Sequence, residues 1–440
     1  MWYPGKKFVI FGIAALLAGS MSLSACGSDT SEQSRSATSD QELLVWGWSG
    51  SPGADVMSDV IEAFESANPG VNVTYNEIAN TEYANAATLG LTSKQDMDVL
   101  TVFPNEWAPD NQDFLLPVEE WVNGSELLEA YEDGPFNQAM SLFPDGVLRA
   151  VPGYSSGGAV AFYNVDLLEK AGFSEPPKTW KEMAELNEGM AKIAPDVMTT
   201  VIPSDEWFQS DVLQTLAGQY DPDFWNKLVY EDGDWNTPAV VQAMTLYQKL
   251  FEDGVLDKGT LDISFADAKS LFATGQAAIF YTGIFDAGML LESNREANGI
   301  EIDDVGMMAV PAEDPETVGV RAFLDTSYGI AEHSKNKDLA AKFIEFLTVG
   351  DGVDVWSARL AGIPANKGWE LPEGTLSSPA AEESMKLIQE LLANPHSDRY
   401  VLSNFEYQTA SYFLEVAAGN MTPEEAAKAG QADWDSGRYN

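Results

Sequence analysis

The stretch ELLVWGWSGSPGADVMSDVIEAFESANPGVNVTYNEI, residues 42–78, contains two runs rich in β-formers on either side of a helical pattern. The opening run, Glu42–Trp48, is mostly apolar and is typical of a buried strand. Apolar residues then recur at helical spacing from Val56 to Phe64, and Asn68-Pro69-Gly70 predicts the end of that helix. The closing run, Val71–Ile78, alternates apolar and polar residues, which indicates a second strand.

The same order continues along the chain. A helical pattern covers Glu82–Ser93, and the apolar run Met97–Phe103 predicts a third, buried strand. Strands that alternate with helices favour right-handed crossovers and a largely parallel sheet. We therefore expect an α/β fold with mostly parallel sheets flanked by helices. A chain of 440 residues is too long for one core, so we expect two lobes.

Later helices are marked by their caps and apolar faces. Thr179 with Glu182, and Thr422 with Glu425, form the pattern of a capping box. Two sets of apolar residues at helical spacing predict core-facing helices: Val240, Met244, Tyr247 and Phe251 in one, and Leu339, Phe343 and Leu347 in the other.

The first residues have the order of a secretory signal peptide. Lys6 and Lys7 precede an apolar run, Phe8–Leu17, which is too short to span a bilayer comfortably. Small residues then lead to Cys26, the single cysteine of the chain. Leu23-Ser24-Ala25-Cys26 resembles the bacterial lipobox, in which the cysteine becomes the first residue and carries lipid. We expect a signal peptide over 1–25 and lipidation at Cys26.

The residues that follow Cys26 are small and polar. Gly27–Gln41 contains no large apolar side chain, so it cannot bury enough surface to offset the entropy of ordering. We expect 26–41 to be the lipidated cysteine and a flexible tether. The protein is then extracytoplasmic and is anchored to the bacterial cell membrane through this lipid alone. A lipid with more than one acyl chain is sufficient for stable anchoring.

Composition excludes several classes of function. The formal net charge is −45, which argues against a nucleic-acid partner and against adhesion to anionic lipid. The chain has two histidines and one cysteine, so a transition-metal site is not expected. It lacks the G-x-S-x-G, P-loop and G-x-G-x-x-G patterns. We expect no catalytic residue, no metal and no cofactor.

Two acidic features leave alternatives open. The acidic loop Tyr230–Asn236 could bind calcium, but the spacing of its acidic residues is not that of an EF-hand calcium loop. With 69 acidic residues, some pair of carboxylates could reach the separation that a glycosidase needs. An anchored glycoside hydrolase is therefore one alternative. A binding protein for a non-sugar ligand such as a polyamine is the other.

Aromatic residues gather where predicted strands end, beside polar side chains. In open α/β sheets, ligands bind outside the carboxyl ends of the strands. An aromatic face offers flat apolar area to a sugar ring, while Asn, Glu and Ser can pair with its hydroxyls. These strand-end residues are Trp46, Trp48, Phe103, Asn105, Glu106, Trp107, Trp207, Phe208, Tyr281 and Phe285. As a set they predict a carbohydrate site.

Five segments in order resemble a known family. They are FYNVDLLEKAGFSEPPKTWKEM (162–183), LFATGQAAIFYTG (271–283), LAAKFIEFLTVGDG (339–352), IPAN (363–366) and AAGNMTPEEAAKA (417–429). Together they resemble the extracellular solute-binding proteins of ABC transporters, family 1, which includes the maltose/maltodextrin-binding proteins. The resemblance covers Leu43 to about Ala429 and implies a two-lobed, periplasmic-binding-protein-like fold with a hinge that closes over ligand.

The resemblance also implies where the chain crosses between lobes. Crossings fall near Ala150–Tyr154, Val305–Pro311 and Val353–Gly362. Lobe one would be 42–152 plus 308–354, and lobe two 153–306 plus 356–440.

The family's ligand-contact positions can be carried over to this sequence. Its sugar-stacking positions fall on Trp207, Phe285 and the Phe405–Tyr407 segment, and its polar positions in the first lobe on Ser49, Asn105 and Glu106. Maltodextrin binders carry a ligand carboxylate in the loop that here reads GYSSGG, with Tyr154 and Ser156 and no acid. That departure disfavours maltose itself. Asp325 is an acid at another lobe-edge position, either a ligand contact or a satisfied buried carboxylate.

The resulting expectation is a non-catalytic, monomeric binding protein that captures an oligosaccharide and presents it to the permease subunits of an ABC importer. The ligand-binding set is Trp48, Ser49, Phe103, Asn105, Glu106, Trp107, Tyr154, Ser156, Trp207, Tyr281, Phe285, Asp325, Phe405 and Tyr407.

Overall fold

The computed structural model describes residues 41–49, 52–105, 107–122, 126–360, 362–393, 397–398 and 403–437. The signal peptide, Cys26 and almost all of the tether lie outside these residues, as does Glu106. Contacts group Asp40–Asn440 into one unit, and the following description concerns that unit alone. Among the described residues, no helix has the length and apolar character needed to cross a membrane.

The described strands belong to one curled sheet in which β2, β1, β3, β8, β4, β6 and β5 are neighbours in that order. Three short strands join it at the side, with β10 on β8 and both β7 and β9 on β4. The strands are β1 Gln41–Trp48, β2 Val71–Ile78, β3 Val99–Val102, β4 Ala150–Asn164, β5 Met198–Val201, β6 Ala277–Gly283, β7 Val305–Ala309, β8 Arg321–Ile330, β9 Ile363–Pro364 and β10 Ser397–Asp398.

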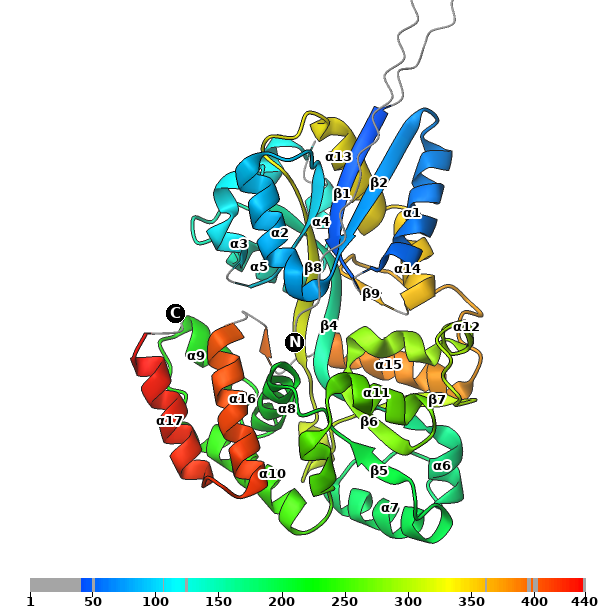
Figure 1. Ribbon diagram of the computed structural model, residues 1–440, viewed down its shortest axis with the longest axis vertical. Helices are drawn as coiled ribbons and strands as arrows, with labels where there is room; N and C mark the ends of the chain where they lie inside the picture. The colour runs from blue at the N-terminus through cyan, green and yellow to red at the C-terminus, as the bar shows by residue number, and fades with distance from the viewer. Residues whose placement is uncertain are drawn as a thin grey trace, which may run out of the picture. The chain divides into compact units, whose positions relative to one another are not determined.

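Helices cover both faces of each half of this sheet, and the two halves form what we call lobe one and lobe two (Figure 1). The helices of lobe one are α1 Ala54–Ala67, α2 Asn80–Ser93, α3 Trp107–Asp110, α4 Glu126–Glu129, α5 Asp133–Ser141, α13 Lys337–Thr348 and α14 Gly352–Leu360, with 3₁₀ turns η1 Gln112–Phe114 and η2 Val118–Glu120. Those of lobe two are α6 Val165–Lys170, α7 Trp180–Ile193, α8 Glu206–Gly218, α9 Phe224–Tyr230, α10 Pro238–Glu252, α11 Phe265–Ala273, α12 Glu292–Ala297, α15 Pro379–Ala393, α16 Ser403–Ala418 and α17 Pro423–Asp435, with η3 Lys258–Asp262, η4 Ile284–Leu290 and η5 Pro315–Thr317.

The lobe-one half confirms the elements predicted from residues 42–103. β1 pairs in parallel with both β2 and β3, and the helices α1 and α2 connect them. The side chains of β3 alternate between two cores, because Val99 packs in the cluster with α1 and α13 whereas Leu100 and Val102 pack in the cluster with α2. A sheet buried on both faces explains why this strand is apolar throughout.

The caps and apolar stripes are confirmed as well. Both capping boxes are present, at the start of α7 and at the start of α17. All four stripe residues of α10 are buried, and in α13 Phe343 and Leu347 are buried while Leu339 packs at the edge of the core.

The strand β4 is longer than the sequence suggested. GYSSGG, expected as a loop, lies within β4 and pairs with β8 from Tyr154 to Gly158. Its glycines permit this, because a Cβ on Gly153 would lie 2.7 Å from the Tyr328 ring and one on Gly158 would lie 2.5 Å from the Asp211 carboxylate. Close approach of neighbouring chains is a common reason for glycine inside a strand.

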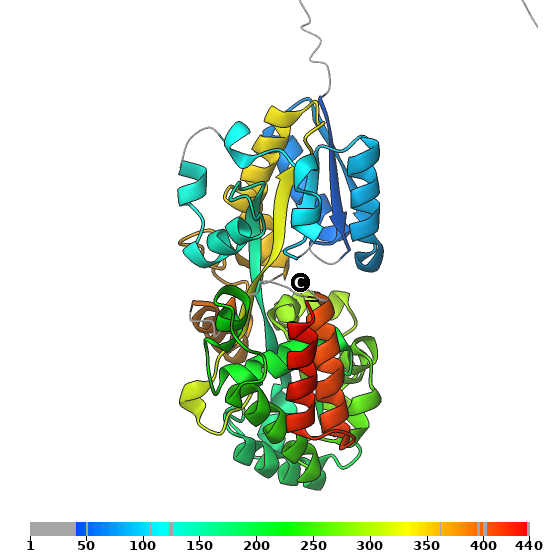
Figure 2. The same cartoon turned by 90° about the vertical axis from the view of Figure 1, so that its left-hand side faces the viewer.

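The chain returns to lobe one along β8 rather than near Val305–Pro311. β7 pairs with the far half of β4, residues 160–164, and so lies wholly in lobe two. β8 pairs with β4 from Arg321 to Gly329, and on its other side it pairs with β3 from Ser327 to Ile330. β4 and β8 therefore run side by side from one lobe to the other (Figures 1 and 2).

Lobe two has two hydrophobic cores, and alternate side chains of β4 pack in one or the other. Ala159, Ala161 and Tyr163 pack with α7, α8 and α10, whereas Val160 and Phe162 pack with α11 and α15. α16 and α17 close the first of these cores at the end of the chain (Figure 2).

Candidate functional site

Strand direction places the carboxyl ends of β1 and β3 at the edge of lobe one that faces lobe two. β8 runs from Arg321 in lobe two to Ile330 in lobe one, and β3 is antiparallel to it. β3 therefore points back toward lobe two, and β1 runs parallel to β3. Trp48, the last residue of β1, and Phe103, which follows β3, consequently lie at this edge.

Trp48 and Phe103 form one aromatic platform. Their rings stack with centroids 4.1 Å apart, and Tyr83 of α2 meets both edge-on at 5.4 Å. Trp48 is buried whereas Phe103 is half-buried, so Phe103 is the ring that presents area outward. The Tyr83 hydroxyl donates to the Thr101 carbonyl at 2.7 Å. Burial raises the pKa of the Tyr83 phenol well above its usual range, so it remains a donor.

The polar residues predicted near this platform have different roles. Ser49 is exposed, with its backbone N–H bound to the Ile78 carbonyl at 2.8 Å. Asn105 is half-buried and its Oδ1 accepts from the Trp107 N–H at 2.9 Å. The Trp107 indole is buried and donates to Thr88 Oγ1 at 2.9 Å, which holds α3 against α2. Trp107 thus supports the edge from behind.

Strand direction applies equally to lobe two. β6 is antiparallel to β4, which enters lobe two from lobe one, so the carboxyl end of β6 points toward lobe one. β5 runs parallel to β6 and ends at the same edge. Phe285, which follows β6, and Trp207, in the first turn of α8 after β5, therefore lie at the edge that faces lobe one.

A second aromatic cluster lies at this edge. The centroid of Trp207 is 5.0 Å from that of Phe265 and 6.1 Å from that of Phe285. All three side chains are half-buried, as expected of rings that present one face outward. The Phe265 N–H donates to Asp205 Oδ2 at 2.6 Å, so the beginnings of α8 and α11 are joined directly.

Phe265 was not among the residues predicted from the sequence. It follows Ser264, whose hydroxyl caps α11 by accepting from the Asp267 N–H. The cap predicts a helix start, but nothing local to residues 264–267 indicates that this start lies beside Trp207. The link to Asp205 spans 60 residues of sequence.

Several predicted residues lie in the core instead of at an open edge. Tyr281 and Phe405 are fully buried, the latter with its ring 5.1 Å from Trp235. Ser156 is fully buried in β4, and Tyr154 is buried against Trp356 at 5.7 Å. Burial leaves these four side chains little surface for direct contact with a ligand.

Tyr407 and Asp325 differ in exposure. Tyr407, in the first turns of α16, is 45% exposed, and only Leu89 and Ile193 are other exposed large apolar or aromatic side chains in the described part of the chain. Asp325 is half-buried in β8, between the two lobe ends of that strand. Tyr407 therefore has the more exposed side chain of the two.

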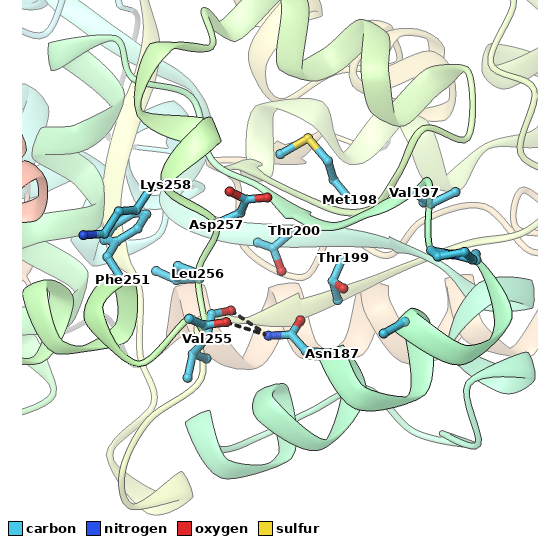
Figure 3. Close-up of a pocket in the computed structure, with 14 residues that line it drawn as sticks. Asn187, Val197, Met198, Thr199, Thr200, Phe251, Val255, Leu256, Asp257 and Lys258 are labelled. Atoms are coloured by element: carbon cyan, nitrogen blue, oxygen red, sulfur yellow. Dashed lines mark hydrogen bonds between the residues drawn. The ribbon is translucent and has the colours of Figure 1, made fainter.

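Three of the cavities in the described part of the chain lie near the elements discussed above. One of 530 Å³ lies beside the crossing strands and is lined from both lobes, by residues of α5, by residues of α15 and by Trp369. One of 510 Å³ lies between α11 and η4, with Phe285 in its wall. One of 460 Å³ lies in lobe two between α7, β5 and the end of α10, where Asn187 donates to the Val255 carbonyl (Figure 3).

No group of three or more His, Cys, Asp or Glu side chains is placed to hold a metal ion within the described residues. In the acidic loop, Trp235 is fully buried in lobe two, and the Asn236 N–H donates to Gln431 of α17 at 2.9 Å. These contacts give the loop a role in packing α17.

Comparison with known proteins agrees with this arrangement. The family model described as bacterial extracellular solute-binding protein matches residues 47–349. A binding protein of Brucella abortus (strain 2308) is 25% identical over 314 residues, which is 70% of this chain and 72% of that one. The galactooligosaccharide-binding protein of Bacillus subtilis (strain 168) is 23% identical over 434 residues, 96% of this chain and 94% of that one. Among solved structures, maltose-bound MalE3 of T. maritima superposes with a TM-score of 0.70 at 19% identity, covering 90% of this chain and 99% of that one.

Proposed function

The chain belongs to the bacterial extracellular solute-binding proteins, and from that membership we propose that it captures an oligosaccharide between the aromatic edges of its two lobes. Membership of a family of binding proteins agrees with the prediction that the chain is not an enzyme, so the glycoside hydrolase alternative is set aside. The observation that carries the proposal is that two half-buried aromatic surfaces lie at lobe edges that face each other.

The chemistry of these edges suits a neutral sugar chain. Phe103 in lobe one and Trp207, Phe265 and Phe285 in lobe two offer ring faces for the C–H faces of sugars. Ser49 and Asn105 lie within the same strand-end segments and can pair with hydroxyls. Two separate aromatic surfaces favour a ligand with more than one ring, and the name of the Bacillus subtilis relative supports this class.

The crossing strands β4 and β8 act as the hinge for closure of the two lobes. Because both strands connect the lobes, bending within them changes the distance between the two aromatic edges. A ligand that touches both edges binds the closed form better than the open form and shifts the population toward closure. The closed form would then present both lobes to the permease subunits of an ABC importer.

We propose the lobe boundaries as expected from the sequence, 42–152 with 308–354 and 153–306 with 356–440, with two changes. Residues 356–360 belong with lobe one, because they complete α14 and Trp356 packs in the core that holds α1 and α13. Because the return crossing lies on β8, residues 308–320 belong with lobe two. The Ala312 N–H bond to the Lys178 carbonyl at 3.1 Å and the Tyr220 bond to Glu313 at 2.9 Å support this assignment.

We also propose the signal peptide over 1–25, lipid on Cys26 and a tether over 26–41, on the sequence pattern alone. The protein would act as a monomer held at the cell membrane. Cell fractionation of wild type and Cys26→Ala tests this. Wild type should sediment with membranes and the variant should be released, and equal release of both would refute lipid anchoring.

The ligand proposal is tested by titrating the soluble chain from residue 42 onward with galacto-, malto-, xylo- and chito-oligosaccharides and with spermidine. Tryptophan fluorescence and calorimetry report binding, and chromatography of the ligand afterwards reports whether it is intact. We expect one oligosaccharide class to bind and to be recovered unchanged. A response to spermidine alone would support the polyamine alternative and overturn the proposal.

A further inference from the structure

The guanidinium of Arg321 lies between two carboxylates inside lobe two. Its Nη1 donates to Asp211 Oδ1 and to Glu406 Oε2, each at 3.1 Å, and its Nη2 donates to Glu406 Oε1 at 2.8 Å. The bond to Glu406 is therefore bidentate, which fixes direction as well as distance. Asp211 and Glu406 are separated from Arg321 by 110 and 85 residues of sequence.

All three side chains are buried, with exposed fractions of 0% for Arg321, 2% for Asp211 and 1% for Glu406. The guanidinium also lies over the Trp225 ring, with its Cζ 4.9 Å from the centroid. Ser210 Oγ donates to the same Glu406 carboxylate at 3.3 Å. The cluster therefore joins the crossing strand β8 to the helices α8, α9 and α16.

Two of these helices carry aromatic side chains that reach the surface, the half-buried Trp207 of the proposed site on α8 and the exposed Tyr407 on α16. Asp211 lies one helical turn after Trp207 on α8, on the same side of the helix. Glu406 is the neighbour of Tyr407 on α16. Arg321 is the first residue of β8, where that strand leaves lobe two. The cluster thus connects the start of the hinge strand with the helix turns that present Trp207 and Tyr407.

We propose that Arg321 is a positioning residue for the ligand site, because it holds α8 and α16 at a fixed place relative to the crossing strand β8. When the strand bends, Trp207 and Tyr407 move with it as one body. This inference rests on the proposed function for the identity of the ligand, and on the geometry of the ligand-free chain for the positioning itself.

A purely structural role would be the simpler explanation of a buried ion pair. Replacing such pairs with apolar side chains is often neutral or stabilising, so net stability is a weak reason for keeping one. The directional, bidentate contact instead specifies one arrangement of the groups that it joins. The two explanations differ in what a conservative substitution does to the position of Trp207.

The test uses fluorotryptophan-labelled protein, residues 42–440, without ligand. The Trp207 resonance in the fluorine NMR spectrum is assigned with Trp207→Phe. Glu406→Gln and Asp211→Asn keep the size of each side chain and remove its charge, and Arg321→Lys keeps the charge but not the bidentate geometry. Glu182→Gln is the control, since it removes a charge from α7 in the same lobe and the carboxylate of Glu182 accepts its hydrogen bonds from the N–H groups of Lys178 and Thr179, outside the Arg321 cluster.

We expect Glu406→Gln, Asp211→Asn and Arg321→Lys to shift or broaden the Trp207 resonance, and Glu182→Gln to leave it unchanged. For the oligosaccharide identified with wild type, the dissociation constant should rise about tenfold in Glu406→Gln. An unchanged Trp207 resonance and unchanged affinity in the folded variants, with only the melting temperature lowered, would overturn the inference. Failure of wild type to bind any sugar refutes the proposed function instead, and the resonance, measured without ligand, still decides whether Arg321 positions Trp207.

Discussion

The rings of Trp48 and Phe103 lie face to face, with centroids 4.1 Å apart and planes inclined by 7°. One ring is buried and the other half-buried, so the pair has a supporting member and a presenting member. This division of roles leads to opposite predictions for two substitutions at the same platform.

Phe103→Ala should weaken oligosaccharide binding about tenfold, which corresponds to about 1.4 kcal/mol, because it removes the ring that faces outward. Trp48→Ala should instead lower the free energy of unfolding by about 3–5 kcal/mol, because it empties a buried site. Calorimetric titration and chemical denaturation of both variants separate the two effects. Equal loss of stability in both would show that Phe103 is also a core residue.

At the opposite edge, Trp207→Ala should weaken binding by about tenfold or more while leaving the melting temperature of the ligand-free protein nearly unchanged. The reason is that Trp207 is half-buried. Of the three rings that it contacts, Phe265 and Phe285 are themselves half-buried, while Phe208 lies in the core. Affinity is measured by calorimetry and the melting temperature by scanning calorimetry.

The matched control for Trp207 is Tyr220→Ala. Tyr220 follows the far end of α8, is half-buried, and bonds to Glu313 at 2.9 Å. The Tyr220→Ala variant should have a lower melting temperature than wild type and an unchanged affinity for the oligosaccharide. If Trp207→Ala lowers the melting temperature more than Tyr220→Ala and leaves affinity intact, Trp207 belongs to the core and not to the site.

Local pattern was sufficient for the elements of residues 42–103, because helical spacing and strand alternation are properties of neighbouring residues. The ends of strands could be predicted for the same reason. Phe103 and Trp207 were therefore correctly expected at strand ends, and these ends form the facing edges of the two lobes. The capping boxes of α7 and α17 were predictable because each needs only a span of four residues.

What local pattern did not reveal depends on contacts between distant segments. GYSSGG contains two glycines at its end and suggests a loop, yet it forms part of β4 because Tyr328, Val320 and Asp211 pack where side chains would otherwise be. Phe265 joins the aromatic edge through Asp205, and Arg321 meets its two carboxylates from 85 and 110 residues away. Burial, moreover, placed Phe405 and Tyr281 in the core although their segments matched the family's pattern.

The close approach of Asp211 to β4 predicts the effect of Gly158→Ala. The added Cβ would lie 2.5 Å from Asp211 Oδ2 and 2.8 Å from its Cγ, so α8 or the strand must shift. We expect the free energy of unfolding to fall by about 1–3 kcal/mol, the usual cost of overpacking. Denaturation in urea measures it.

Gly134→Ala is the control for Gly158→Ala. Gly134 lies in α5, and a Cβ there would meet nothing within 4 Å. Alanine in an open helical position should raise stability by about 0.5–1 kcal/mol. Equal changes in the two variants would contradict the steric account of Gly158.

The capping box of α7 predicts a dependence of stability on pH. Glu182 accepts from the Lys178 N–H at 2.7 Å and the Thr179 N–H at 3.0 Å, and chiefly the first of these bonds lowers the pKa of the Glu182 carboxyl.

A pKa lowered by folding means that the ionised carboxylate stabilises the folded state above the unfolded pKa of about 4.3. This contribution is lost as the pH falls through the folded-state pKa. Glu182→Gln should therefore melt below wild type at pH 7, and the difference should shrink progressively as the pH falls below the unfolded pKa of about 4.3. Glu188→Gln removes the same charge from the exposed face of α7 and leaves the cap intact, so it should show no such convergence. Scanning calorimetry of the three proteins from pH 7 downward through the unfolded pKa of about 4.3 provides the measurement. A difference that stays constant for Glu182→Gln would mean that the cap acts through its shape alone.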